Sequence, residues 1–243
     1  MDLTGLNIID ACVLVLLGLG AVLGFKRGFT KTLATSVGFV LIIILAFLLK
    51  NPVSEFMYQN FPFFNFWGIF KGVTVLNILL YEVIAFLIIL SILSIILKVV
   101  IFATSVFEKI LNITIILGIP SKILGMLVGI IEYYVISFVI LFVISLPIFN
   151  LEFIEGSKWR LPILNNTPIL TDLSKETIQV FEEFSNLNEK YKDSKNAEEF
   201  NKEALEVFLK YKVITPESAS KLNEKRKLKI EDITTIIEKY REG

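Results

Sequence analysis

Three carboxylates interrupt long apolar stretches of this chain, and they are the residues whose type and position most directly suggest chemistry. Asp10, Glu82 and Glu132 are each the sole charge in an apolar run. A charge inside a bilayer is costly, so such a residue is a functional candidate by default. The sequence therefore directs attention first to what these three acids could do in a membrane.

Glu82 and Glu132 could form one site. Each lies about ten residues from the end of its run, or roughly 15 Å along a helix, so antiparallel helices would bring both near the midplane. Two adjacent acids within about 6 Å could share a proton or hold a cation. In the alternative interpretation, each is neutral and bonded to a Ser, Thr or Tyr across a helix interface. Asp10 lies near a helix end, where a structural role, at the interface or as a cap, is expected.

Residue types absent from the chain exclude several kinds of enzyme. There is no histidine in the 243 residues, which excludes a Ser-His-Asp triad, a Cys-His pair and every histidine-based zinc site. The single cysteine, Cys12, has no partner for a disulfide and is expected to be a small core residue. We therefore expect no enzyme activity, no cofactor and no metal site.

The composition is that of a membrane protein. Hydrophobic residues make up 54% of the chain, and the mean hydropathy is +0.70, which is too apolar for an ordinary soluble domain. Only 8 of the 24 Lys and Arg and 6 of the 24 Asp and Glu lie in the first 150 residues. Neither part has the basic excess that binding to nucleic acid would need, so nucleic acid is excluded as a partner.

Four apolar runs predict an all-α polytopic bundle of transmembrane helices. A helix of 18 residues spans roughly 27 Å, close to the hydrocarbon thickness of about 30 Å. The expected spans are Ile8–Phe25, Thr32–Leu49, Gly72–Leu97 and Ile123–Phe149.

The sequence also predicts the structure of three segments between these spans. Lys50-Asn51-Pro52 should end the second span, and the aromatic-rich residues 53–71 should form an interfacial loop or short surface helix. Residues 105–119 are too short and too interrupted for a span, which predicts an interfacial or partly re-entrant helix.

Small residues recur every four positions in three of the spans, which places them on one helix face. In a bilayer such a face lets two helix backbones approach closely. The first and fourth spans are therefore candidates for packing on each other. The residues are Gly20, Gly24 and Gly28, then Ala34 and Gly38, and then Ser121, Gly125 and Gly129.

The chain after Pro147 becomes polar. Residues 151–171 contain prolines and an Asn-Asn-Thr run, typical of a juxtamembrane linker. Residues 172–243 carry apolar side chains at helical spacing and predict a small extramembrane domain of three or four helices. Thr215, Pro216 and Glu217 form a helix start. The expected division is thus a membrane domain over 1–150, the linker, and the helical domain.

Three segments of the membrane part together carry a resemblance to a known family. They are Asn7-Ile8-Ile9-Asp10, Gly24-Phe25-Lys26-Arg27-Gly28-Phe29 and Ser121-Lys122-Ile123-Leu124-Gly125-Met126-Leu127-Val128-Gly129. They resemble the colicin V production protein (CvpA) family over about residues 5–150. The resemblance implies a polytopic bacterial inner-membrane protein, required for colicin V production and export, with no settled molecular activity. Some related proteins carry an extracytoplasmic serine protease, an activity that a chain without histidine does not share.

Two functions from different classes follow. The first is an accessory or scaffolding protein in toxin production, export or envelope processes, with the lipid bilayer, copies of itself or other envelope proteins as partners. The alternative is a channel or proton-coupled transporter that uses Glu82 and Glu132. Basic residues in the turn at Lys26, Arg27 and Lys31 place that turn in the cytoplasm by the positive-inside tendency. Both termini are then expected on the extracytoplasmic side of the cell membrane.

Overall fold

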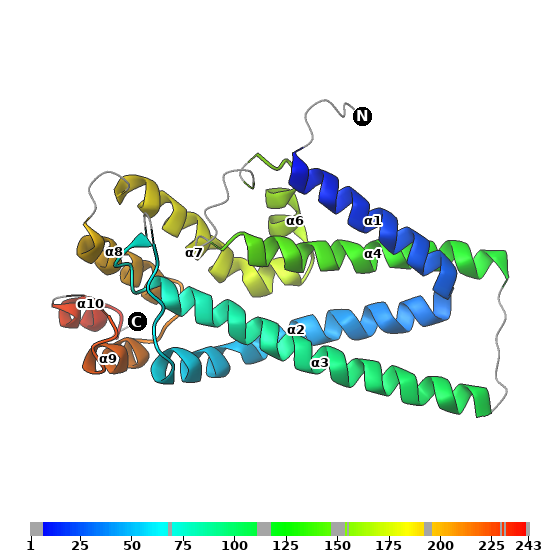
Figure 1. Ribbon diagram of the computed structural model, residues 1–243, viewed down its shortest axis with the longest axis horizontal. Helices are drawn as coiled ribbons and strands as arrows, with labels where there is room; N and C mark the ends of the chain where they lie inside the picture. Colours follow the sequence, from blue (N-terminus) through cyan, green and yellow to red (C-terminus); the bar gives the residue numbers. More distant parts are fainter. Residues whose placement is uncertain are drawn as a thin grey trace. The chain divides into compact units, whose positions relative to one another are not determined.

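A computed structural model of the chain describes residues 7–67, 70–110, 118–146, 154, 156–191, 196–228, 230 and 232–241. These residues form α-helices joined by turns and contain no strand, which confirms the all-α class (Figure 1). The chain divides into two compact units that interleave along the sequence. The first comprises residues 1–48, 87–143 and 151–170, and the second comprises residues 49–86, 144–150 and 171–243.

Within the described residues, four helices are long and apolar enough to cross a membrane. This confirms a multi-pass membrane protein. The four are α1 (Ile8–Arg27), α2 (Phe29–Asn60), α3 (Leu76–Ile110) and α4 (Ile119–Ile144). Asn7 begins α1, because its side chain accepts a hydrogen bond from the Ile9 N–H.

The first unit is organised by a close crossing of α1 and α4, which run at an angle to each other and meet toward the end of α1 in Figure 1. A Cβ atom added at Gly24 would collide with the carbonyl oxygen of Gly125. One added at Gly129 would collide with the carbonyl oxygen of Gly20. The two backbones thus touch where both helices carry only glycine, the arrangement that stabilises helix pairs in lipid.

The turn from α1 to α2 is attached to the start of α4. Gly28 has φ +78°, a left-handed conformation that favours glycine, and its N–H donates to the Gly24 carbonyl at 3.0 Å. The next N–H, of Phe29, donates to the Ser121 hydroxyl at 3.0 Å. Gly38 faces the Leu97 side chain of α3. Ala34, in contrast, is exposed in the structure and lies outside these contacts.

The expectation that Lys50-Asn51-Pro52 ends the second span is wrong. Helix α2 continues through Pro52 to Asn60, although a proline in a helix interior removes a backbone hydrogen bond and costs about 3 kcal/mol. The continuation buries Ser54, Met57 and Tyr58 within the second unit. Burial in the tertiary structure therefore outweighs the local stop signal. Residues 53–60, expected in an interfacial loop or short surface helix, are helical as the continuation of α2.

Helix α3 has two parts with different surroundings. From Leu76 to Phe86 it is buried on nearly every side, as a helix in a protein core is. Beyond Leu87 most of its apolar side chains are exposed, for example Ile95 and Val99 at 62% each, although Ile89 is buried. The extra length of this helix therefore forms the core of the second unit.

The expected separate helix over 105–119 is also not observed in the described residues. Residues 105–110 continue α3, because no glycine or proline interrupts the chain between Leu97 and Ile110. Helix α4 already begins at Ile119, and residues 111–117 lie outside the described part. The single cysteine, Cys12, is exposed and not in the core as expected.

The expected linker contains ordered structure that belongs to the first unit. Helix α6 (Arg160–Asn166) buries Ile163 and Leu164. The Thr167 hydroxyl lies 3.1 Å from the Tyr134 hydroxyl of α4. The boundaries of the two units are not those of the domains expected from the sequence, which were 1–150, 151–171 and 172–243. Residues 49–86 belong to the same unit as residues 171–243.

The second unit contains the tail helices, whose number agrees with the expected three or four. They are α7 (Leu170–Tyr191), α8 (Ala197–Lys210), α9 (Pro216–Glu224) and α10 (Ile233–Lys239). The Phe184 ring is buried in the second unit, and its centroid lies 5.0 Å from that of Phe200 and 6.2 Å from that of Phe208. Thr215 caps α9 by accepting from the Ser218 N–H, so the helix start expected at this position is confirmed.

Three tail helices share a Lys-Tyr ending that the sequence analysis missed. At the ends of α7, α8 and α10, each lysine ammonium lies over the ring of the tyrosine that follows. Each also forms an ion pair with a glutamate of another helix. Lysine at a helix end complements the helix dipole. The pairs are Lys190 with Glu203, Lys210 with Glu183, and Lys239 with Glu206.

The glycine crossing generates a prediction with an internal control. Gly24→Leu should lower stability by about 1–3 kcal/mol or prevent folding, because the side chain has no space between the two backbones. Gly18→Leu in the same helix should have little effect, since nothing lies within 4 Å of a Cβ there. Thermal unfolding in detergent measures both variants. Equal stability of the two would contradict the crossing.

Candidate functional site

Glu132 lies in the first unit, where three helices meet. Its Oε1 accepts from the Arg27 guanidinium at 3.5 Å, and its Oε2 accepts from the Ser36 hydroxyl at 3.1 Å. Arg27 ends α1, Ser36 belongs to α2, and Glu132 belongs to α4. The glycine crossing of α1 and α4 brings the arginine within reach of the acid, so the same packing that holds the helices also neutralises the charge.

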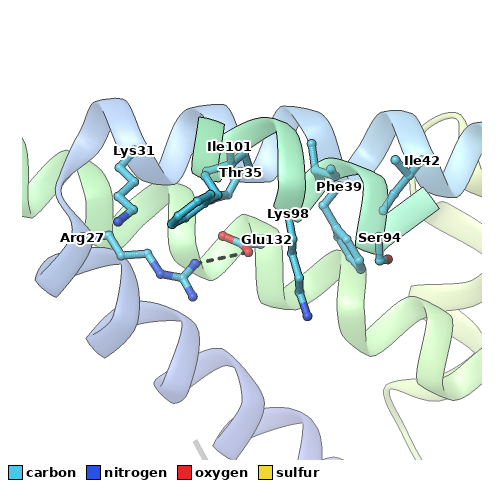
Figure 2. Close-up of a pocket in the computed structure, with 11 residues that line it drawn as sticks. Arg27, Lys31, Thr35, Phe39, Ile42, Ser94, Lys98, Ile101 and Glu132 are labelled. Atoms are coloured by element: carbon cyan, nitrogen blue, oxygen red, sulfur yellow. Dashed lines mark hydrogen bonds and ion pairs between the residues drawn. The ribbon is translucent and has the colours of Figure 1, made fainter. Parts of the chain in front are cut away.

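A cavity of about 640 Å³ opens beside this ion pair (Figure 2). Its volume is in the range of small-molecule sites. Helices α2 and α3 provide most of the walls, and their side chains are mainly apolar with several cations. The lining residues are Arg27, Lys31, Thr35, Phe39, Ile42, Ser94, Leu97, Lys98, Ile101, Phe102 and Glu132.

Charge is unevenly distributed around the cavity. Arg27 is offset by Glu132, at a side-chain exposure of 34% and 11% respectively. Lys31 and Lys98 have no acidic partner among the described residues. The cavity thus has an excess of positive charge, and its chemistry suits a bound anion. The described residues contain no group of three His, Cys, Asp or Glu that could hold a metal ion.

Glu82 is in a different environment, in the second unit. It forms a buried ion pair with Lys50, with side-chain exposures of 5% and 8%. The Thr177 hydroxyl of α7 donates to the Glu82 Oε1 at 2.9 Å. The Glu82 Oε2 atom is buried with no hydrogen-bond partner in the described part of the chain. A polar tail helix therefore covers this acid. The position of Glu82 in its apolar run predicted a location near the midplane of the membrane, but its neighbours in the structure are polar residues of the second unit.

Asp10 is fully buried and holds a turn of the first unit. Its carboxylate accepts from the Ser157 hydroxyl at 2.6 Å and from the N–H groups of Lys158 and Trp159 at 3.2 Å each. The Ser157 Oγ in turn accepts from the Arg160 N–H at 3.1 Å. Asp10 thus has a structural role, as a cap for the segment before α6 and, through a hydrogen bond from the Asn7 backbone N–H, for the start of its own helix.

The three acids therefore occupy three separate environments. The structure gives Glu82 and Glu132 different partners in different units, instead of the joint site considered from the sequence. Ser36 and Thr177 are the kind of hydroxyl partner expected in the alternative interpretation. The sequence did not identify Arg27 and Lys50 as partners of these acids. In the sequence, Arg27 indicates only the orientation of the α1–α2 turn, and Lys50 only the expected end of the second span.

Comparison with known families matches residues 9–168 to the colicin V production protein family. The chain belongs to this family. The matched region of the CvpA chain includes Asp10, the α1–α4 crossing, Glu132 and the turn at Ser157. The family region thus extends through α6, beyond the boundary near residue 150 that the resemblance suggested.

A curated relative supports the membrane assignment. The uncharacterized transmembrane protein YshB of Bacillus subtilis (strain 168) is 32% identical over 175 residues, which cover 69% of this CvpA-family chain and 96% of the relative. No solved structure matches the chain.

The buried ion pair generates a prediction about stability. Lys50→Met should destabilise the protein by about 3–5 kcal/mol, because it leaves the Glu82 carboxylate buried without a cation. The double variant Lys50→Met/Glu82→Met should regain most of the lost stability, since a buried ion pair can often be replaced by apolar side chains of similar volume. Thermal unfolding in detergent compares the variants.

The exposed pair of Lys190 and Glu203 provides the control. Lys190→Met should have a much smaller effect than Lys50→Met, because exposed pairs contribute little. If the double variant were no more stable than Lys50→Met, the unpaired Glu82 carboxylate would not be the cause of the lost stability.

Proposed function

We propose that this CvpA-family protein is a non-enzymatic accessory protein of the cell membrane that supports toxin production, export or another envelope process. Its role would be to hold partner proteins at the membrane. The family description names colicin V production, and that process requires a peptide to be made and exported. Copies of this chain or other membrane and envelope proteins are the proposed partners.

The observation that carries this proposal is the pairing of both membrane glutamates inside the protein. Arg27 and Ser36 occupy the two oxygens of Glu132, and Lys50 is bound to Glu82. A transport site needs a carboxylate that is free to bind the transported ion, and both acids are already bound by cations and hydroxyls of the protein. Acids fixed in this way are better suited to holding helices together than to carrying protons.

The proposed location is the bacterial cell membrane, with both termini on the extracytoplasmic side. The α1–α2 turn carries Lys26, Arg27 and Lys31, and the positive-inside tendency places such a turn in the cytoplasm. On the opposite side, Lys50 is buried in its ion pair and so does not act as a loop charge. Four spans return the chain to the side on which it started.

A transport assay tests the proposed role. Protein reconstituted into vesicles with a pH-sensitive dye inside should show no proton flux above that of empty vesicles. Glu132→Gln is the informative variant, since glutamine has nearly the same shape and one acceptor oxygen for Ser36 or Arg27, but it cannot carry a proton. Proton flux that depends on the protein and is lost in Glu132→Gln would favour the transporter instead.

Complementation provides the matched measurement in cells. In a strain that lacks this protein, Glu132→Gln should restore toxin export or envelope resistance to nearly the level of the unmodified chain. Gly24→Leu should not restore it, because the helix crossing fails. Loss of function in Glu132→Gln at an unchanged amount of protein in the membrane would contradict an accessory role.

Reporter fusions test the orientation. A reporter that is active only outside the cytoplasm should work when fused after Gly243, and it should fail when inserted in the α1–α2 turn after Lys26. A cytoplasm-only reporter should show the reverse pattern. Activity of the cytoplasmic reporter at the C-terminus would show that the orientation or the number of spans is different.

A further inference from the structure

Two lysines of the first unit lie on membrane helices without a counter-charge. Lys31 belongs to α2 and Lys98 to α3, and both are exposed and line the cavity. Neither forms an ion pair with a described residue. A cation at an apolar surface is costly unless it reaches water or an anion, so these lysines are available to bind an anion at the membrane surface.

Apolar side chains make up about half of the cavity lining, together with Thr35, Ser94 and Glu132, and the cavity extends along α2. Figure 2 shows Arg27 and Lys31 at one end and Phe39 and Ile42 at the other. Ile42 is 11 residues beyond Lys31, which corresponds to roughly 16 Å along the helix axis. Figure 2 shows Lys98 between these ends, beside Phe39, so the site combines cations with apolar side chains along its length, and a matching ligand has an anionic group joined to a hydrocarbon chain.

The surface around the cavity faces hydrocarbon. Phe102, which lines it, is 72% exposed, and Ile95 and Val99 on the same helix are 62% exposed. Exposed apolar side chains of a membrane helix are suited to contact with lipid. Lysine suits such a surface, because its flexible stem lies along apolar surface while its ammonium reaches the level of the headgroups.

We propose that this cavity binds an anionic phospholipid. The phosphate group is held by Lys31 and Lys98, and an acyl chain lies against Phe39 and Ile42. Basic pockets between membrane helices bind acidic headgroups by this chemistry. Because Glu132 already offsets Arg27, the two free lysines select a lipid with net negative charge over a zwitterionic one. The inference rests on the membrane location and not on the proposed accessory role.

Native mass spectrometry of the full chain in detergent tests this proposal with two lipids of identical acyl chains. With equal amounts of phosphatidylglycerol and phosphatidylcholine added, the protein should retain phosphatidylglycerol preferentially. The variant Lys31→Gln/Lys98→Gln should bind it roughly tenfold more weakly, since each basic contact to an acidic headgroup contributes to binding. Equal retention of the two lipids by the unmodified protein would overturn the proposal.

Two further variants separate a formed cavity from general charge attraction. Lys26→Gln removes an exposed cation that does not line the cavity, and it should leave lipid retention unchanged. Ser94→Trp fills the cavity while it keeps every charge, and it should reduce retention as the double lysine variant does. A loss in Lys26→Gln as large as in the double variant, or normal binding by Ser94→Trp, would overturn the site.

A soluble competitor distinguishes a lipid from a free anion. Glycerol 3-phosphate in large excess should not displace phosphatidylglycerol, because it lacks the acyl chain that lies against Phe39 and Ile42. Displacement by glycerol 3-phosphate would assign the site to a soluble anion and refute the lipid. Thermal unfolding of each variant, with melting temperatures close to that of the unmodified protein, ensures that the comparison is between folded proteins.

Discussion

The contact of two glycine-bearing helix faces is the interaction on which the first unit depends. Because Gly24 and Gly125 have no side chains, the backbones of α1 and α4 touch. Lipid offers no hydrophobic drive for helices to associate, so this packing must supply much of the stabilisation. It also has a chemical result, because it brings the end of α1 close enough for Arg27 to reach Glu132.

The same constraint accounts for the cavity. Arg27 is drawn toward α4, the turn at Gly28 fixes the start of α2, and Lys31 follows one turn later. With the acid already bound by Arg27 and Ser36, the lysines of α2 and α3 keep their charge available. A packing motif without functional groups of its own therefore determines where positive charge is presented.

The amino-acid sequence predicted the class, the four spans, the tail helices and the glycine faces, because these follow from apolar content and from periodicity. It failed where distant segments decide the outcome. Pro52 is a strong local stop signal, yet burial of Met57 and Tyr58 keeps α2 helical. Glu82 is in an apolar run, yet it pairs with Lys50 and accepts a hydrogen bond from Thr177, which is 95 residues away in the sequence. Periodicity carries no information about such long-range pairing, so it could not separate the two glutamates.

The interleaved units have a consequence for biosynthesis. The second unit needs residues 49–86 and also residues 171–243, so it cannot be completed until the ribosome has made both segments. Until then the segment from Leu76 to Phe86, which is apolar on nearly every face, lacks the tail helices that cover it, and Glu82 lacks Thr177. A chain interrupted during synthesis would expose this segment, and exposed apolar surface is prone to aggregation. Folding of the second unit is therefore coupled to the translation of residues 171–243.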